Sequence, residues 1–270
     1  MLRFERVSYR YAGYAKPVLH DIDLTLADGE ILGVVGPNEG GKSTLCLVAS
    51  GLAPGSIGGG LTGTVSIDRS SMAGRPLHEF ATKVGICFQN PATQLSGVTG
   101  SVFEEVALGP MNLGLLARET VERTKEALAT LDIGHLAERE PRRLSGGQAQ
   151  LVVIASLLAM QPAHLVLDEP TAQLDPAGTR LVAEALRGLA TSGTALLIVE
   201  HKTDLLDGLC GRIVVLDGGR IVLDGPAREM LEDPGLEALG VDPPSRVRLA
   251  RALATRGLDP ALVDAGGRAS

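Results

Sequence analysis

A glycine-rich loop between an apolar strand and a helix most narrows what this chain can fold into. The loop reads Gly36, Pro37, Asn38, Glu39, Gly40, Gly41, Lys42, Ser43 and Thr44, which fits the pattern G-x-x-x-x-G-K-[ST]. The apolar run Ile31–Val35 before it predicts a buried parallel strand, and a helical pattern over Ser43–Ser50 follows. Backbone N–H groups and the dipole at such a helix start attract phosphate. Lys42 is expected to reach the β- and γ-phosphates of a nucleotide, and the Ser43 hydroxyl to bind Mg²⁺.

The composition is that of a globular protein with one large domain and an appendage, or with two small domains. The chain has 270 residues, 44% hydrophobic but only 3% aromatic, so Leu, Val, Ile and Ala must fill the core. A formal net charge of −7 gives no overall basic surface, so no nucleic-acid partner is expected. The apolar runs near Leu151–Met160 and Ala195–Val199 fall short of the ~20 residues that cross a bilayer, so membrane attachment would need a partner. Cys46, Cys87 and Cys210 have no metal-ligand spacing and are expected to be free thiols in a reducing cytosol.

Short apolar strands alternate with helices along most of the chain, which predicts an α/β fold with a mainly parallel sheet. The stretch from about residue 93 to 160 has helical periodicity and is expected to be a helical insertion into that fold. The expected strands are 2–8, 20–26, Ile31–Val35, Thr64–Asp68, Leu165–Leu167, Ala195–Val199 and a hairpin of Arg212–Leu216 with Arg220–Leu223. The expected helices include Ser101–Leu108, Glu119–Leu131 and Ser245–Arg256, and residues 55–63 are expected to form a loop.

Two acidic residues follow the apolar run Leu165–Leu167. Asp168 would stand at the carboxyl end of a strand beside the phosphate loop, where a carboxylate can hold the Mg²⁺ shell. Glu169 is the candidate general base for a water that attacks the γ-phosphate. An acidic pair after a strand is more often a solvated loop start, but its combination with a phosphate loop reverses that preference.

A second anion-binding helix start is predicted at the segment Leu144, Ser145, Gly146, Gly147 and Gln148, where a serine and two glycines open a helical run. One nucleotide does not need two such sites from the same subunit. The economical arrangement is a dimer in which each nucleotide lies between the phosphate loop of one subunit and the Ser-Gly-Gly segment of the other.

In this order the motifs resemble those of the nucleotide-binding subunits of ABC transporters, over nearly all of residues 1–225. The resemblance implies ATP binding and hydrolysis by a P-loop NTPase with a RecA-like core, an N-terminal antiparallel β subdomain and the inserted helical subdomain. Gln89 is similar to the Q-loop glutamine, which contacts Mg²⁺ and the attacking water and couples to the membrane partner. Asp175 is similar to the D-loop aspartate at the dimer interface, and His201 to the switch histidine at the γ-phosphate. Tyr11 resembles the aromatic residue that stacks on adenine, and the nearby Tyr14 is the alternative.

Residues 88–116 resemble one branch of that family, the ATPases of energy-coupling-factor (ECF) importers, which take up vitamins or transition-metal ions. The resemblance rests on FQNPATQL at 88–95 and VFEEVALGPMNLGLL at 102–116, and on a tail with GVDPP at 240–244 and VRLARAL at 247–253. It implies a second ATPase subunit, a transmembrane scaffold that docks around Gln89–Leu116, and a small membrane protein that captures the solute. The chain would then work at the cytoplasmic face of the inner membrane. The C-terminal extension, 226–270, would be a small helical unit, either packed on the domain or used in dimerisation.

Four positions depart from the family pattern. Glu39 and Gln173 replace small residues in the phosphate loop and the D-loop, His164 stands at a usually apolar strand position, and Leu151 replaces a common Arg. These departures leave open a weakly catalytic member of a heterodimer, although the intact catalytic candidates argue against it. The alternative function is a soluble ABC ATPase without a membrane partner. Such proteins often carry two fused ATPase units or long coiled coils, whereas this sequence has one unit and no heptad stretch.

Overall fold

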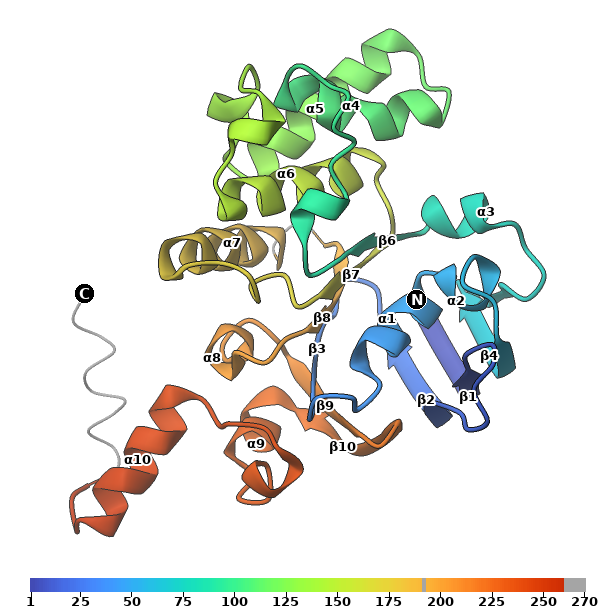
Figure 1. The fold of residues 1–270 in the computed structure, drawn as a ribbon. Helices are drawn as coiled ribbons and strands as arrows, with labels where there is room; N and C mark the ends of the chain where they lie inside the picture. The colour runs from blue at the N-terminus through green and yellow to red at the C-terminus, as the bar shows by residue number, and fades with distance from the viewer. Residues whose placement is uncertain (191–192, 260–270) are drawn as a thin grey trace.

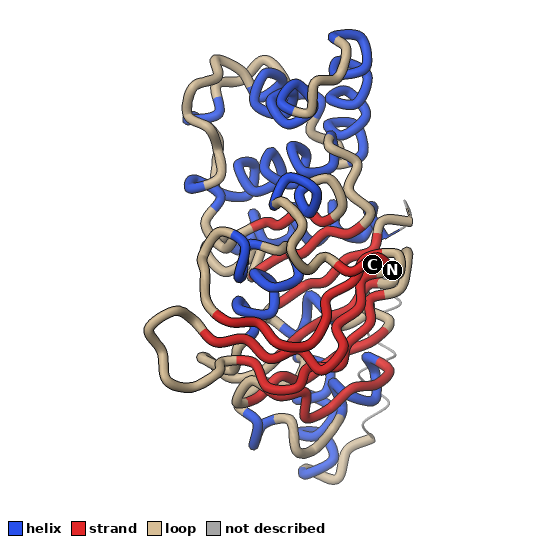
Figure 2. The backbone as a smooth tube through the Cα atoms, turned by 90° about the vertical axis from the view of Figure 1, so that its right-hand side faces the viewer, coloured by secondary structure: helices blue, strands red, loops and turns tan. Residues whose placement is uncertain are grey.

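The computed structural model describes residues 1–190 and 193–259, which build two β-sheets and the helices packed on them (Figures 1 and 2). The smaller sheet is antiparallel, with strand order β2-β1-β4-β5, and the larger has the order β10-β9-β3-β8-β7-β6. The strands of the smaller sheet are β1 (Leu2–Arg10), β2 (Leu19–Leu26), β4 (Gly60–Ile67) and β5 (Ser70–Ser71). Those of the larger sheet are β3 (Ile31–Val35), β6 (Val84–Cys87), β7 (His164–Asp168), β8 (Ala195–Val199), β9 (Arg212–Asp217) and β10 (Arg220–Pro226).

The larger sheet is parallel from β9 to β6, and β10 pairs antiparallel with β9 as the predicted hairpin. Its parallel strands are almost wholly buried, which explains why they read as continuous apolar runs in the sequence, whereas the edge strand β10 is not buried. Alternate residues of each strand face two different cores. Val35 and Leu167 belong to a core shared with buried side chains of the helices α6 (Gly146–Ala159) and α7 (Pro176–Ala190). Val34 and Val166 belong to a core shared with the antiparallel sheet and α1 (Lys42–Ala49).

The predicted helical insertion consists of α4 (Val102–Asn112), α5 (Ala117–Thr130) and α6, which pack on one another at the top of Figure 1. Ser101 begins α4 with a capping box, because its side chain accepts from the Glu104 N–H and the Glu104 carboxylate accepts from the Ser101 N–H. The expected α/β fold with an antiparallel N-terminal part and a helical insertion is therefore confirmed. Short helices connect these elements: α2 (Leu52–Gly55), α3 (Leu77–Ala81), η1 (Pro91–Thr93), η2 (Gly134–Leu136) and η3 (Pro141–Arg143).

One expected loop is wrong in part. Residues 55–63 were expected to be irregular because of their glycines, but β4 begins at Gly60. Gly60 pairs with Arg10 and Leu61 with Tyr9 of the long strand β1. This pairing extends β4 to Gly60, although glycine has a low intrinsic preference for strands. Residues 56–59 remain outside regular structure.

After the hairpin, the described part of the expected extension is helical, with α9 (Ala227–Glu232), η4 (Glu237–Leu239) and α10 (Ser245–Thr255). The short helix α8 (Thr203–Leu206), which was not expected, precedes the hairpin. Residues 260–270 of the expected extension lie outside the described residues. Across 1–190 and 193–259, none of the helices has the length and apolar character that a membrane span needs.

Candidate functional site

The phosphate loop curls tightly between β3 and α1. A Cβ atom on Gly36 would lie 2.0 Å from the backbone oxygen of Leu216 on β9, and the Gly36 φ angle is +152°, so only glycine fits there. Lys42 opens α1, and its Nζ donates to the carbonyl oxygens of Gly36 at 2.9 Å and Pro37 at 2.7 Å. Burial is the largest influence on this ammonium and lowers the pKa of Lys42. The Lys42 ammonium thus lies inside the phosphate loop, at the start of α1, where the sequence pattern predicts phosphate binding.

Ser43 and Asp168 bring two oxygen ligands together beside the phosphate loop. The Ser43 hydroxyl donates to Asp168 Oδ1 at 3.1 Å, joining the start of α1 to the end of β7. Burial raises the pKa of the Asp168 carboxyl, and the hydrogen bond from Ser43 opposes that shift. Mg²⁺ at nucleotide sites takes one or two protein oxygens and completes its shell with water and phosphate. The pair fits such an ion.

Glu169 is held by residues from two neighbouring loops. The Gln89 side-chain amide, in the loop after β6, donates to Glu169 Oε2 at 2.9 Å. His201, two residues beyond the end of β8, has its Nε2 atom 3.0 Å from Glu169 Oε1. Glu169 itself has a left-handed φ of 50°, a conformation that costs a non-glycine residue energy and often marks functional sites. The carboxyl ends of the adjacent parallel strands β6, β7 and β8 thus deliver the three predicted catalytic candidates to one point.

The loop that carries Gln89 is shaped by two other polar side chains. Gln94 accepts from the Phe88 N–H at 2.6 Å and donates to the Ile86 carbonyl at 3.0 Å. Asn90 caps η1 by accepting from the Ala92 N–H at 3.0 Å. Gln94 was part of the predicted motif but received no role, and the structure gives it one: it ties the backbone just before Gln89 to the loop that follows.

Glu200 and Lys202 flank His201 and were missed by the sequence reasoning. Glu200 is 1% exposed, and its carboxylate accepts from the N–H and hydroxyl of Thr171 and from the N–H groups of His201 and Lys202. Lys202 Nζ donates to the Thr171 carbonyl at 2.8 Å and to Thr179 Oγ1 at 3.1 Å. These bonds join residues 200–202, which contain His201, to Thr171 just before the D-loop and to Thr179 just after it. The signal available in the sequence was a charged residue at the end of an apolar strand, next to a candidate histidine.

Two tyrosines lie near α1 at the candidate adenine position. The Tyr11 hydroxyl is 3.0 Å from Thr44 Oγ1, and the Tyr11 ring packs edge-on against Tyr9 with centroids 5.0 Å apart. Tyr14 is exposed, with its ring centroid 6.0 Å from that of Tyr11. Tyr11 therefore contacts α1, the helix that follows the phosphate loop, whereas Tyr14 is exposed to solvent.

The Ser-Gly-Gly segment and the D-loop form a second cluster. Ser145 caps α6 in a capping box with Gln148, following the half-buried Leu144. A Cβ atom on Gly147 would lie 2.7 Å from the Cα of Gly178, so the starts of α6 and α7 touch backbone to backbone. Asp175 caps α7 by accepting from the Gly178 N–H at 2.6 Å. Ser145, Gly146 and Asp175 are exposed, so their surface is available to a second subunit.

The four residues that depart from the family pattern lie in different surroundings. Glu39 is exposed and has a left-handed φ of 62°, so its side chain points away from the buried part of the loop. Gln173 is exposed on the D-loop and Leu151 is fully buried in the helical core. His164 is fully buried, and neither of its ring nitrogens has a hydrogen-bond partner.

Comparison with known proteins gives consistent matches. The chain matches the family described as ABC transporter over residues 19–172. A putative ABC transporter ATP-binding protein of Pyrococcus abyssi is 41% identical over 96% of this chain and 92% of that protein. The energy-coupling factor transporter ATP-binding protein EcfA of Methanosarcina acetivorans is 39% identical over 96% of this chain and 91% of that protein.

Solved structures agree with these sequence matches. The protein cbiO1 from Clostridium perfringens, described as part of the ABC transporter complex cbiONQ, superposes with a TM-score of 0.75 at 31% identity. That superposition covers 84% of this chain and 89% of the other. The ATP-binding cassette MJ0796, a dimer in a post-hydrolysis state bound to ADP and Pi, gives a TM-score of 0.70 at 26% identity, over 84% and 99% of the two chains.

Proposed function

The chain belongs to the ABC transporter ATP-binding family and is an ATPase, and we propose that it energises an ECF-type importer for a vitamin or a transition-metal ion. The importer assignment is supported by the similarity to EcfA and cbiO1 and by the 88–116 sequence that resembles ECF ATPases. The observation that carries the catalytic part is the cluster in which Gln89 and His201 hold the two carboxylate oxygens of Glu169.

The residues of the phosphate loop bind and orient ATP in this proposal. Lys42 turns its ammonium from the Gly36 and Pro37 carbonyls to the β- and γ-phosphates, and the backbone N–H groups of the loop and of the α1 start surround them. Ser43 and Asp168 would hold Mg²⁺, which when bound neutralises charge on the phosphates.

Glu169 acts as the general base. One of its oxygens accepts a proton from a water molecule while the water oxygen bonds to the γ-phosphorus and the bond to the ADP oxygen breaks. Gln89 orients the water and the carboxylate, and His201 turns its N–H from Glu169 to the γ-phosphate when ATP is bound. Before ATP binds, Gln89 and His201 contact different oxygens of Glu169 and keep the carboxylate in one orientation beside the phosphate loop, which supports a rate enhancement through positioning.

The second cluster completes the site of another subunit. The exposed Ser145 and Gly146 at the positive end of α6 would meet the phosphates of an ATP bound to the partner, with Asp175 beside the interface. ATP would close such a dimer, and hydrolysis with product release would reopen it. The dimeric MJ0796 cassette is a precedent for paired subunits in this family.

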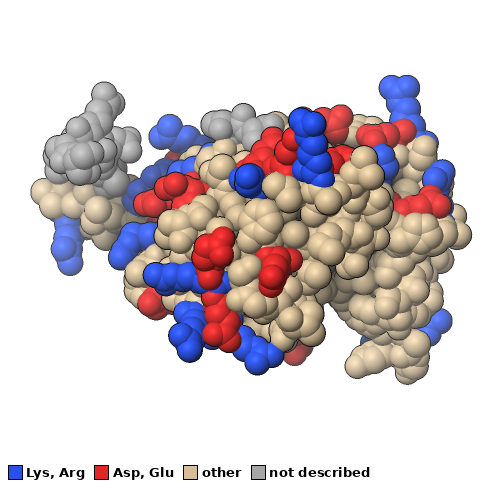
Figure 3. Space-filling view, turned by 90° about the horizontal axis from the view of Figure 1, so that it is seen from above, with Lys and Arg blue, Asp and Glu red and all other residues tan. Residues whose placement is uncertain are grey.

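The surface around Gln89–Leu116 is the proposed docking site for a transmembrane scaffold subunit. It exposes large apolar side chains, with Val98 83% and Leu116 78% exposed and Met111 nearby on α4. Between the Gln89 loop and the Ser-Gly-Gly segment lies a pocket of about 460 Å³ lined by Leu95, Arg142 and Leu174 among others. A docked protein would cover these exposed apolar side chains and remove them from water. On the face seen in Figure 3, charges of both signs are interspersed around broad uncharged areas.

The test is a pull-down of the tagged chain from detergent-solubilised native membranes, with partners identified by mass spectrometry. Recovery of a multi-spanning scaffold protein with a small membrane-embedded binder is the expected result, and the binder identifies the solute. In the same experiment a Leu116→Asp variant should fail to recover the scaffold, because binding would bury a carboxylate in the apolar interface. Recovery of only soluble proteins or ribosomes would overturn the importer proposal and favour a soluble ABC ATPase.

A further inference from the structure

The segment that joins η4 to α10 is bonded to α8, the short helix just after the switch histidine. The Thr203 hydroxyl donates to the Asp242 carbonyl at 2.7 Å. The Ser245 N–H and hydroxyl donate to the two oxygens of Asp204, at 2.7 Å and 2.8 Å. The Asp204 carboxylate thus satisfies the first N–H group of α10, where a negative charge also meets the helix dipole favourably.

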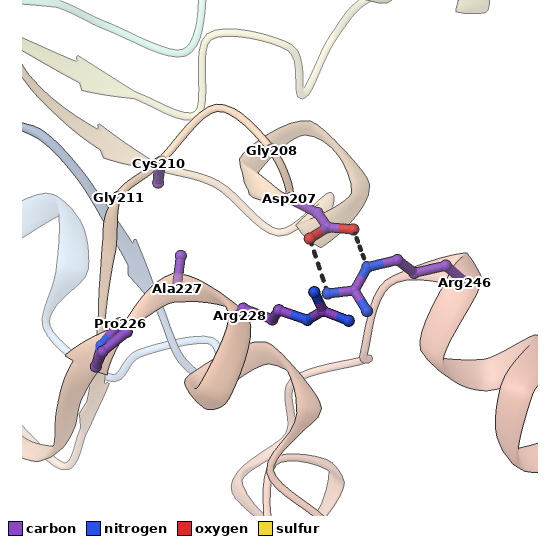
Figure 4. A pocket seen from close by; sticks show the side chains of 8 residues that line it. All are labelled: Asp207, Gly208, Cys210, Gly211, Pro226, Ala227, Arg228 and Arg246. Atoms are coloured by element: carbon purple, nitrogen blue, oxygen red, sulfur yellow. Dashed lines mark hydrogen bonds and ion pairs between the residues drawn. The ribbon is translucent and has the colours of Figure 1, made fainter. Parts of the chain in front are cut away.

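A two-pronged ion pair adds to these bonds. Arg246 Nε and Nη2 donate to the two oxygens of Asp207, at 2.6 Å and 3.0 Å (Figure 4). Its Nη1 donates to Glu232 Oε1 at 2.6 Å. Such a planar fork on a carboxylate fixes orientation as well as distance. Arg228 lies at the same pocket and pairs with Glu232 at 3.2 Å. Arg246 is therefore the guanidinium that connects the extension to the end of α8.

Helix α8 depends on these contacts because it has only four residues. A single helical turn is not stable by itself and needs tertiary packing. Its apolar residues Leu205 and Leu206 are buried in the same core as Val241, which directly precedes the bonded segment. Its polar residues are those that bond to the extension. The extension thus supports α8 through both an apolar and a polar side.

The backbone at His201 is fixed between two supports. On one side the buried Glu200 carboxylate accepts from the N–H groups of His201 and Lys202. On the other side the chain passes from Lys202 directly into α8. The His201 side chain is 40% exposed and reaches Glu169 Oε1, so its reach depends on where its backbone is held.

We propose that residues 242–246 form a latch that positions His201 through α8, so that the C-terminal extension sets the rate of ATP hydrolysis. Asp242, Ser245 and Arg246 are positioning residues in this arrangement. The inference rests on the proposed role of His201. It gives the extension a function within its own subunit, separate from any contact that α10 makes with a partner.

The test compares ATP hydrolysis and ATP affinity in purified full-length Arg246→Ala and Arg228→Ala variants. Displacing a reacting group by about 1 Å can cost on the order of 100-fold in rate, so Arg246→Ala is expected to lower kcat about tenfold. Its Kd for ATP should stay within about twofold, because no phosphate-loop residue has changed. The Arg228→Ala control, which removes a guanidinium from the same pocket, should change kcat by less than about twofold. Arg246→Lys keeps a positive charge near Asp207 and should recover part of the rate.

The decisive readout is the coupling to His201. In a His201→Ala background the histidine can no longer act, so adding Arg246→Ala should lower the single-turnover rate by less than about twofold. An equal loss with and without His201 would overturn the latch, and so would an Arg246→Ala enzyme with wild-type kcat. If Arg246→Ala does not fold, Ser245→Ala removes a single hydroxyl bond and decides by the same criteria, with an expected loss of about twofold in the presence of His201.

The same variants separate the two levels of the proposal. Wild-type hydrolysis by His201→Ala alone would refute the role of His201 in the proposed function, and the latch with it. Slow hydrolysis by His201→Ala beside unchanged hydrolysis by Arg246→Ala would refute the latch only.

Discussion

Replacing Glu200 with glutamine tests how far the site depends on a buried carboxylate that touches no reacting group. The two oxygens of Glu200 together accept from the N–H and hydroxyl of Thr171 and from the N–H groups of His201 and Lys202. Glutamine keeps one accepting oxygen and replaces the other with an NH₂ group. If the oxygen faces His201 and Lys202, the Thr171 hydroxyl can rotate to accept from the NH₂ group, but the Thr171 N–H is left without an acceptor.

One buried N–H without an acceptor costs about 1–3 kcal/mol, and the loss of charge from the remaining bonds adds to it. We therefore expect Glu200→Gln to lower the free energy of unfolding by about 2 kcal/mol, which for a chain of this size lowers Tm by roughly 4–8 °C. The shift at Thr171 and His201 should also lower kcat about tenfold with little change in ATP affinity. Thermal unfolding followed by circular dichroism and steady-state ATP hydrolysis measure both effects.

Glu229→Gln is the matched control, because Glu229 is exposed on α9 and the same chemical change there should leave Tm and kcat unchanged. A Glu200→Gln protein with Tm within about 1 °C of the wild type and an unchanged kcat would refute the reasoning. It would mean that the bonds to the Glu200 carboxylate add nothing beyond what an amide provides.

Three further predictions concern the departures and the tyrosines. Glu39→Gly removes a left-handed non-glycine residue and a carboxylate from the phosphate loop, so Kd for ATP should fall about two- to fivefold in a fluorescent-nucleotide titration, and an unchanged or higher Kd would show that this carboxylate is harmless. Stacking on a base is worth about 1–3 kcal/mol, so Tyr11→Ala should weaken ATP binding about tenfold or more and Tyr14→Ala clearly less, and the reverse order would assign the stacking to Tyr14. Burial lowers the pKa of His164 below its ordinary value of 6.5 in the folded state, so the folded state resists this proton and loses stability as pH falls below that value. His164→Leu should raise Tm at neutral pH and reduce the loss of Tm between pH 7.5 and 5.5, and an equal loss in both proteins would contradict this.

The candidate site could be predicted where the chemistry depends on residues close in the chain. The phosphate loop and the pair Asp168 and Glu169 each follow an apolar run, so strand and loop are read together. The contact of Glu169 with Gln89 and His201 needed more, because it depends on β6, β7 and β8 being neighbours in the sheet. Only the family resemblance pointed to these last two residues.

The supporting contacts could not be predicted because they join distant parts of the chain. Glu200 finds Thr171 across 29 positions, and Ser245 finds Asp204 across 41. Neither pair has a local pattern that differs from a solvated acid or a polar turn. The early start of β4 has the same cause, since pairing with β1 overrides the low strand propensity of Gly60.

The role of Glu169 as general base is tested most simply by measuring ATP turnover and ATP affinity of a Glu169→Gln variant. Glutamine preserves the shape of the side chain but cannot take the proton from water. We expect turnover to fall at least about 100-fold while Kd for ATP stays within about threefold, because the phosphate loop and its lysine are unchanged. Turnover at the wild-type rate would show that Glu169 is not the general base.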